Sequence, residues 1–332
     1  MPDDQQLPPG AYHPPSPALV RRSVRAKIAV WIGIAVLCAV AIVALALTTG
    51  WPAITPVTQV LSFLPVFTAL TLVLVIGMLV IREWLIAALA AAFVALFATY
   101  IFSGAAVPPW PIDTGAPTVR IVTANLHKGD ATPALVSRIL ADPPDLVFIQ
   151  ECTQECVAGI GSPVVRAKLP HQIVDADPSP AGAAILSAWP LEQLPVAQTS
   201  FSMPAATVSS PSGELTVRSA HPAPPVPGGV GLWGSELADL ADFAAGSEQP
   251  LIMAGDFNAT PYHRQYRDIR DSGALIEAVG SFPGTWRSDW PGFLRTPIDH
   301  ILMPADWRAV TTAVEPLQGS DHALLSATLV RL

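Results

Sequence analysis

The sequence has almost no charge in most of its first third and few lysines anywhere. Residues 28–104 contain two charges, Arg82 and Glu83, and the whole chain of 332 residues contains three lysines. A soluble domain needs a charged surface, so this composition excludes one that begins at the N-terminus. We therefore expect a membrane part followed by a soluble part.

Basic residues are also scarce in the soluble part. From residue 105 onward the chain has 13 basic and 23 acidic residues, a net charge of about −10. Proteins that bind nucleic acid usually carry a basic surface that neutralises phosphates. The acidic balance therefore argues against nucleic acid as the partner.

Cysteine is scarce as well, with Cys38 in the first apolar stretch and Cys152 and Cys156 four residues apart. If that segment is helical, the pair is within marginal reach of a disulfide in an oxidising compartment. The interpretation that the sequence favours is two small, half-buried cysteines without a bond.

What the first third does contain is three apolar stretches, at 28–48, 58–81 and 84–103. Each has about the 20 residues that a helix needs to cross a hydrocarbon core of about 30 Å. Residues 28–104 are therefore predicted to form three transmembrane helices. A signal peptide explains the first stretch poorly, because it is long and two more stretches follow.

Basic residues flank these stretches on one side only: they are Arg21, Arg22, Arg25, Lys27 and Arg82. By the positive-inside rule the N-terminus lies in the cytoplasm, and three spans place everything after residue 104 outside the cell membrane. Residues 1–27 are predicted to be a disordered cytoplasmic tail, and 105–118 a stiff Pro-rich linker. The linker keeps the soluble domain, 119–332, close to the bilayer.

Several apolar runs of the soluble part end in polar residues. Residues 251–254 are apolar and stop at Gly255, which delivers Asp256 and Asn258 together. Such a pair alone caps a turn more often than it catalyses. Other predicted strands end in the same way, and the collected set is Asn125, Glu151, His221, Asp256, Asn258, Asp299, Asp321 and His322.

Oxygen donors dominate this set, with only two histidines and no paired thiols. Such donors suit Mg²⁺ or Mn²⁺ better than Zn²⁺. These ions polarise phosphoryl oxygens and activate water, so the set predicts hydrolysis of a phosphate ester. Strands outnumber helices, which are expected at 133–140, 232–245 and 262–279, and this favours packed sheets with helices outside them over one doubly wound sheet.

Six motifs carry a resemblance to a known family: they are TANL at Asn125, FIQE at Glu151, SAHPAP at His221, GDFNAT at Asp256 and Asn258, TPIDHIL at Asp299, and GSDHALL at Asp321 and His322. From about residue 118 to 332 the chain resembles the endonuclease/exonuclease/phosphatase superfamily, which contains DNase I-like nucleases, inositol phosphatases and neutral sphingomyelinases. The resemblance implies an α/β fold, the DNase I-like four-layer sandwich of two packed mixed β-sheets flanked by helices, here preceded by three transmembrane helices.

The resemblance also implies roles for these residues. Glu151 is the principal metal ligand, assisted by Asn125 and Asp321. Asp256 positions or deprotonates the attacking water, and Asn258 binds the phosphate. His322, oriented by Asp299, and His221 stabilise the developing charge or protonate the leaving oxygen.

Two positions depart from the family pattern. His127 stands where many family nucleases have a second acid, which puts a second acidic ligand in doubt. Many family members close the middle strand with serine followed by arginine or lysine, and this chain has Ser187 followed by Ala188. It therefore lacks a cation that could contact a nucleic-acid backbone.

Three other residues are weighed separately. His300 follows Asp299 and should point to the opposite face of its strand, so a structural role is expected. Trp286 and Trp290 either wall the site, meet the membrane interface or pack within their own loop, and the sequence does not choose among these.

Three spans followed by such a domain also resemble a narrower, membrane-anchored group, the VanJ group of teicoplanin-resistance proteins. The resulting hypothesis is a membrane-anchored, metal-dependent phosphoesterase that acts on a membrane lipid, a lipid-linked cell-wall intermediate or another envelope phosphate ester. The alternatives are an extracytoplasmic Mg²⁺-dependent nuclease and an inactive membrane sensor or scaffold. The sequence gives no oligomeric state.

Overall fold

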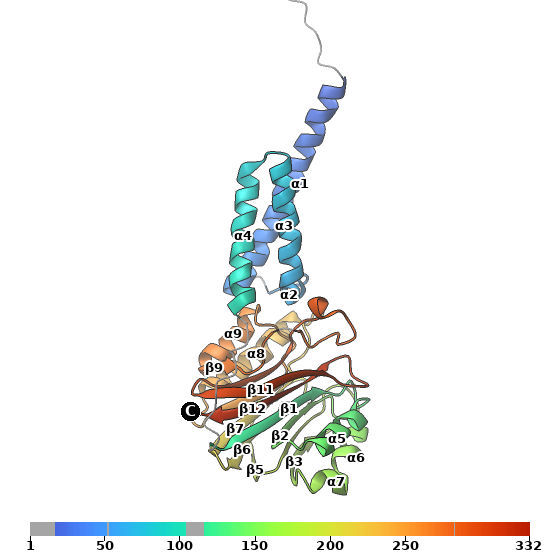
Figure 1. Ribbon diagram of the computed structural model, residues 1–332, viewed down its shortest axis with the longest axis vertical. Helices are drawn as coiled ribbons and strands as arrows, with labels where there is room; N and C mark the ends of the chain where they lie inside the picture. Colours follow the sequence, from blue (N-terminus) through green and yellow to red (C-terminus); the bar gives the residue numbers. More distant parts are fainter. Residues whose placement is uncertain (1–16, 52, 104–115, 282) are drawn as a thin grey trace, which may run out of the picture.

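The computed structural model describes residues 17–51, 53–103, 116–281 and 283–332. Its N-terminal part, here called the helical region, consists of α1 (Pro17–Thr49), α2 (Val57–Ser62), α3 (Leu64–Val80) and α4 (Trp84–Ser103). Helices α1, α3 and α4 lie side by side above a β-rich domain, with α2 at their foot (Figure 1).

Two segments of the helical region are long and apolar enough to cross a membrane, judged by length and composition: Ala26–Thr49 and Trp84–Ser103. The second of the three expected spans, 58–81, is divided at Phe63 into α2 and α3, and α3 has only 17 residues. Pro65 lies in the first turn of α3, where a proline starts a helix readily but cannot continue one. Of the three expected full-length spans, the structure therefore shows two helices of sufficient length and one shorter apolar helix.

The expected tail and linker differ from the structure at their edges. Residues 17–27 are not disordered but form the start of α1, which is rich in the good helix formers alanine, leucine and arginine. Residues 1–16 and most of the linker, 104–115, lie outside the described residues.

The rest of the chain, here called the sandwich, contains two six-stranded sheets. The first has the order β11-β12-β1-β2-β4-β3, and the second the order β5-β6-β7-β8-β10-β9. Strands β1 and β2 pair in parallel, as do β7 and β8, and the other pairs are antiparallel, so both sheets are mixed.

The strands of the first sheet are β1 (Thr118–Asn125), β2 (Leu146–Gln150), β3 (His171–Asp175), β4 (Ala183–Ser187), β11 (Trp307–Pro316) and β12 (Ala323–Arg331). The strands of the second are β5 (Leu191–Leu194), β6 (Ala205–Ser210), β7 (Gly213–Ala220), β8 (Leu251–Asp256), β9 (Leu275–Glu277) and β10 (Asp299–Pro304).

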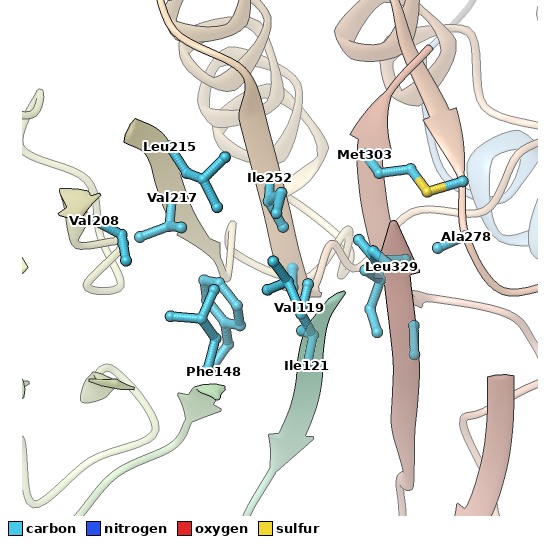
Figure 2. Packing of buried hydrophobic residues seen from close by; sticks show 14 of the residues in the cluster. Val119, Ile121, Phe148, Val208, Leu215, Val217, Ile252, Ala278, Met303 and Leu329 are labelled. Carbon is cyan, nitrogen blue, oxygen red and sulfur yellow. The ribbon is translucent and has the colours of Figure 1, made fainter. Parts of the chain in front are cut away.

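The core between the sheets follows from the alternation of side chains along each strand. Val119 and Ile121 of β1 and Phe148 of β2 face Val217 of β7 and Ile252 of β8 (Figure 2). All five are fully buried or nearly so. Alternate residues of the same strands point outward and need a second cover.

Helices provide that cover on both outer faces. Helices α5 (Thr132–Ala141), α6 (Gln154–Ile160) and α7 (Pro163–Arg166) pack on the first sheet, and α8 (Val230–Ala245) and α9 (Arg264–Ser272) on the second. These layers confirm the predicted four-layer sandwich. The helix expected at 262–279 was too long: α9 ends at Ser272, Gly273 follows it, and the chain then forms β9.

Candidate active site

The predicted site residues continue the inward-facing rows of the strands. In β8, Ile252 and Ala254 point into the core between the sheets, and Asp256 is the next residue of that row. In β10, Ile301 points into the same core, and Asp299 ends its row directly opposite Asp256. Because side chains alternate along a strand, the face that buries apolar groups presents carboxylates at its edge.

Asp256 is the centre of the hydrogen-bond network. Its Oδ2 accepts from Asn125 Nδ2 at 3.1 Å, and its Oδ1 accepts from the backbone N–H of Asn258 at 2.8 Å. The Asn258 side chain donates to the carbonyl of Pro222 at 3.0 Å. Burial raises the pKa of Asp256 to about 7, and nearby Asp299 adds to the rise against the opposing effect of His322. This carboxylate is therefore a base of moderate strength.

Gly255 explains why the GDFN motif needs its glycine. Its φ is 151°, a backbone conformation that residues with a side chain rarely adopt. A Cβ at this position would lie 2.1 Å from the carbonyl oxygen of Ala220 on β7. Glycine thus allows β7 and β8 to run together up to the point where Asp256 enters the site.

His322 forms a charge pair between two carboxylates. Its Nδ1 lies 2.9 Å from Asp299 Oδ2, and its Nε2 lies 3.7 Å from Asp256 Oδ2. Burial lowers the pKa of His322, but the two carboxylates outweigh that effect and raise it to about 10. The ring is therefore a cation at neutral pH.

His221 has the opposite character. Its Nε2 lies 3.9 Å from Asp256 Oδ2, and its ring packs on that of Phe201 with centroids 4.7 Å apart. Burial, and then the charge of His322, lower its pKa to about 3. Its Nδ1 has no hydrogen-bond partner among the described residues. The site therefore holds one charged and one neutral imidazole.

Glu151 and Asp321 approach the same place from the first sheet. Glu151 Oε1 accepts from Asn125 Nδ2 at 3.2 Å, and Oε2 accepts from the backbone N–H of Lys128 at 2.7 Å. Its φ of 57° is unusual for a non-glycine residue, and such strain occurs at functional sites. Asp321 Oδ2 accepts from Trp286 Nε1 at 3.1 Å.

A cavity of about 530 Å³ brings most of these side chains together. It is lined by six of the eight predicted residues: Glu151, His221, Asp256, Asn258, Asp321 and His322. Asn125 and Asp299 lie directly behind them, each hydrogen-bonded to a lining residue. The structure thus assembles the whole predicted set, while the role of each member stays a prediction.

Comparison with known proteins agrees with this geometry. Residues 122–322 match the model of the Endonuclease/Exonuclease/phosphatase family. The chain belongs to this family. Its members are generally metal-dependent hydrolases of phosphoester bonds.

Solved structures with this fold cover 64% of the chain. An endonuclease/exonuclease/phosphatase from Beutenbergia cavernae DSM 12333 is 18% identical with a TM-score of 0.52, and 72% of it is covered. Humanized D. rerio TDP2 is 16% identical (TM-score 0.51, 98% covered), and a functionally unknown conserved protein from Enterococcus faecalis V583 is 15% identical (0.51, 100% covered). At these identities the likeness concerns the fold alone. No curated protein sequence matches the chain.

The donor set fits a divalent metal of the kind that the family uses. Glu151 and Asp321 offer carboxylate oxygens to the cavity. Asn125 turns its N–H₂ group toward Glu151 and Asp256, and its amide oxygen accepts from the backbone N–H of His127 at 2.9 Å. Such hard donors suit Mg²⁺ or Mn²⁺. A second group, Asp256, Asp299 and His322, has its ligand atoms within 4.8 Å of one another. In this group His322 lies between the two carboxylates, with Nδ1 2.9 Å from Asp299 Oδ2 and Nε2 3.7 Å from Asp256 Oδ2.

Sequence reasoning missed the residues that hold these groups in place. Glu236 of α8 is buried and accepts from the backbone N–H groups of Ser200, at 2.6 Å, and Ala223, at 2.7 Å. Trp233, three residues earlier, donates to the carbonyl of Asn258 at 3.0 Å. One face of α8 therefore fixes the segments on both sides of His221. The only signal for Glu236 was an acid at an apolar position of the helix.

The two tryptophans and His300, which were weighed separately, lie on different sides of the site. Trp286 and Trp290 both line the cavity. Of the three alternatives, the structure therefore supports the one in which these tryptophans form a wall of the site. His300 points away from the cavity, with Nδ1 3.1 Å from Glu277 Oε2 and Nε2 2.9 Å from the carbonyl of Ala259. Its expected structural role is confirmed.

The expectation of unbonded cysteines was wrong. Cys152 and Cys156 form a disulfide, and both are fully buried. Cys152 precedes α6 and Cys156 lies in its first turns, so the Cα atoms come within 5.2 Å, a normal spacing for a disulfide. The bond lies next in sequence to Glu151.

Proposed function

We propose that this protein is a membrane-anchored, divalent-metal-dependent phosphoesterase that acts outside the cytoplasmic membrane on a lipid-linked phosphate ester. One observation carries the proposal: the cavity that holds Asp256 and His322 is also lined by residues of α2, at the foot of the helical region. A catalytic site built against apolar helices is placed for a substrate that resides in the bilayer.

The surface of the helical region supports insertion in a bilayer. Large apolar side chains are exposed on its helices, among them Leu70 (63%), Val80 (76%) and Leu85 (73%). Only 22% of the most apolar window of each long helix is buried, unlike the core helix of a soluble protein. The second of these helices lies far from the N-terminus, which argues against a signal sequence. Exposed apolar surface of this extent needs a lipid environment.

The direction of the helices supports the extracytoplasmic side. Lys27 lies toward the free end of α1, and Arg82 lies in the turn between α3 and α4, while the sandwich adjoins the opposite ends of these helices (Figure 1). With the basic residues in the cytoplasm, the sandwich is outside. The disulfide Cys152–Cys156 agrees, since disulfides persist in oxidising compartments.

The chain's own residues account for phosphate hydrolysis. Asp256, with its pKa raised to about 7, accepts a proton from the attacking water and holds that water in line. The cationic His322 faces the negative charge that develops on phosphorus-bound oxygens, and the neutral ring of His221 offers a hydrogen bond without adding charge. Glu151, which accepts a hydrogen bond from Asn125, and Asp321 would hold a divalent ion, which would supply Lewis acidity.

The substrate class follows from the placement of the site. A polyprenyl phosphate or pyrophosphate that carries cell-wall units presents its phosphate at the outer bilayer surface.

We include in the proposal a contribution to resistance against teicoplanin-type antibiotics, because three apolar helices followed by a family domain resemble the VanJ group. The acidic sandwich disfavours long nucleic acid, whose phosphates need basic partners.

A substrate panel tests the proposal. Purified full-length protein with Mg²⁺ is offered undecaprenyl pyrophosphate, sphingomyelin, a phosphoinositide and plasmid DNA side by side, with His322→Ala as the inactive control. We expect hydrolysis of the undecaprenyl lipid, its loss in EDTA and its return with Mg²⁺ or Mn²⁺. Nicking of DNA as the main activity would instead establish the nuclease alternative. Hydrolysis that continues in EDTA would refute the requirement for a divalent metal.

A further inference from the structure

Helix α2 is fixed against the catalytic cavity. The carbonyl of Thr58 lies 2.9 Å from Nε2 of the buried His263 in the sandwich. Gln59 donates through Nε2 to the carbonyl of Pro225. These contacts reach across more than 160 residues of sequence, so α2 is held by the sandwich as well as by its own neighbours.

A continuous series of contacts connects α2 to the catalytic carboxylate. Asp256 accepts from the backbone of Asn258, and the Asn258 side chain donates to Pro222. Three residues later Pro225 accepts from Gln59. The segment 222–227 therefore lies between the catalytic residues and α2, and both Pro224–Pro227 and α2 line the cavity.

Most side chains on this flank of the cavity are apolar; the polar ones are Ser62 and Gln59, and Gln59 donates to the carbonyl of Pro225. Phe63, which separates α2 from α3, lines the cavity together with Pro224, Pro225, Val226 and Pro227. Val226 is 52% exposed, and the segment 222–227 contains no charged residue. A phosphate group gains nothing from contact with apolar side chains. A hydrocarbon chain attached to the phosphate would be stabilised by burying its surface against them.

Phe63 also lies at the foot of the apolar helical region. The next residue, Leu64, begins α3, which lies beside α1 and α4 in the apolar helical region. A cavity of about 530 Å³ holds a ligand of drug size, so it accepts a phosphate head group and a few carbon units but not a long chain. The remainder of such a chain has to leave the cavity toward the membrane.

We propose that Phe63 and Pro224–Pro227 form a subsite for the first hydrocarbon units of the substrate lipid, and that the chain passes α2 directly into the outer leaflet. The inference rests on the proposed function and adds a residue-level prediction to it. The helical region then selects the substrate besides holding the enzyme at the membrane. A water-soluble phosphate ester occupies the catalytic end of the cavity without touching Phe63.

The test compares two substrates that share a head group and differ in chain length: undecaprenyl pyrophosphate and dimethylallyl pyrophosphate. Full-length wild type, Phe63→Ala and Phe63→Leu are assayed at one fixed detergent concentration. The matched control is Phe102→Ala, since Phe102 is 74% exposed near the end of α4 and does not line the cavity. We expect Phe63→Ala to lower kcat/KM for the long substrate about 10-fold or more and to leave the short one unchanged. Phe63→Leu keeps most of the apolar contact and should restore most of the activity.

The outcomes separate this inference from the proposed function. If wild type hydrolyses neither pyrophosphate, the proposed function fails. If it hydrolyses the long one and Phe63→Ala leaves both rates unchanged, the subsite is refuted and the proposed function stands. An equal fall for both substrates assigns Phe63 to folding or head-group binding and also refutes the subsite, as does an equal effect of Phe102→Ala.

Discussion

The helical region and the sandwich are both rich in apolar residues, but they place them in opposite ways. In the sandwich, Ile252 and Ile301 are fully buried between the sheets. In the helical region, Val80 and Leu85 are more than 70% exposed. The strands that carry these two residues are buried on both faces, against the other sheet and against the covering helices. The helices of the helical region are apolar all round and bury only the faces that meet one another. The comparison shows that the sandwich buries its large apolar side chains between its own layers, whereas the helical region leaves many of them exposed, as the proposed insertion in a bilayer requires.

The largest expected effect is a loss of catalytic rate on replacing Asp256, a change confined to the sandwich. Asp256→Asn keeps the shape of the side chain but removes the base, so we expect kcat to fall roughly 10²–10⁴-fold. Asn keeps an acceptor for the backbone N–H of Asn258 but turns an N–H₂ group toward the donor of Asn125, so we expect a small fall in melting temperature beside the large fall in kcat. Activity is measured on a soluble phosphodiester, so that the helical region does not contribute.

Asp289→Asn is the matched control for this loss. Asp289 is an exposed carboxylate that pairs with Arg287 at 2.9 Å and does not line the cavity. Its replacement should leave kcat unchanged. Full activity of Asp256→Asn would remove Asp256 from the mechanism.

A pair of glycines tests the contrast in packing. Gly255→Ala forces a Cβ within 2.1 Å of the Ala220 carbonyl and keeps a strained φ, so we expect the sandwich to lose roughly 2–5 kcal/mol of unfolding free energy. Gly77→Ala in α3 places a Cβ where nothing lies within 4 Å, and no loss is expected. Tryptophan-fluorescence melting of the detergent-solubilised proteins measures both. Equal destabilisation by the two changes would contradict the tight approach of β7 and β8.

Much of the sandwich was predictable because its signals are local. The apolar run before Gly255 marks a buried strand, and the polar residues that follow such runs mark one edge of the sheets. Alternation alone predicted that His300 turns away from Asp299. The family motifs added the order of the layers, which local patterns do not contain.

The parts that were missed depend on contacts between distant segments. The capping of Ser200 and Ala223 by Glu236 and the contact of His263 with α2 join residues far apart in the chain. The break at Phe63 lies within one apolar stretch, and hydropathy does not show it. β9 replaced the end of a predicted helix because Gly273 and the left-handed Ala274 (φ 49°) turn the chain.

His263 lies at the junction between the two regions, where its Nε2 is 2.9 Å from the carbonyl of Thr58 in α2. Burial lowers the pKa of His263 to about 4, so the folded protein binds this proton less readily than the unfolded chain, whose histidine titrates near 6.5. The stabilising effect of the neutral ring is therefore fully present above about pH 6.5 and is lost as the pH falls through 4, by roughly 3 kcal/mol in total. Thermal unfolding of the full-length protein between pH 7.5 and 4.5 measures the loss.

His263→Gln isolates this effect from the other titrating groups. Glutamine stays neutral at every pH and keeps a donor for the Thr58 carbonyl, so the stability of the variant should depend less steeply on pH than that of wild type. Identical pH dependence in the two proteins would show that His263 does not couple protonation to the junction.

The smallest expected effect belongs to Glu236, which acts on the site without touching it. Its two carboxylate oxygens each accept one backbone N–H, and Glu236→Gln replaces one acceptor with an N–H₂ group that faces a donor. The segments that carry Phe201 and Ala223 then separate, and His221 loses its fixed position between them. We expect kcat on a soluble phosphodiester to fall about 10-fold with KM unchanged, since one hydrogen bond to a charged group contributes about 1.5–3 kcal/mol. Asp242→Asn, on an exposed turn of the same helix, should change neither constant. A rise in KM at constant kcat would mean that α8 shapes substrate binding and not the position of His221.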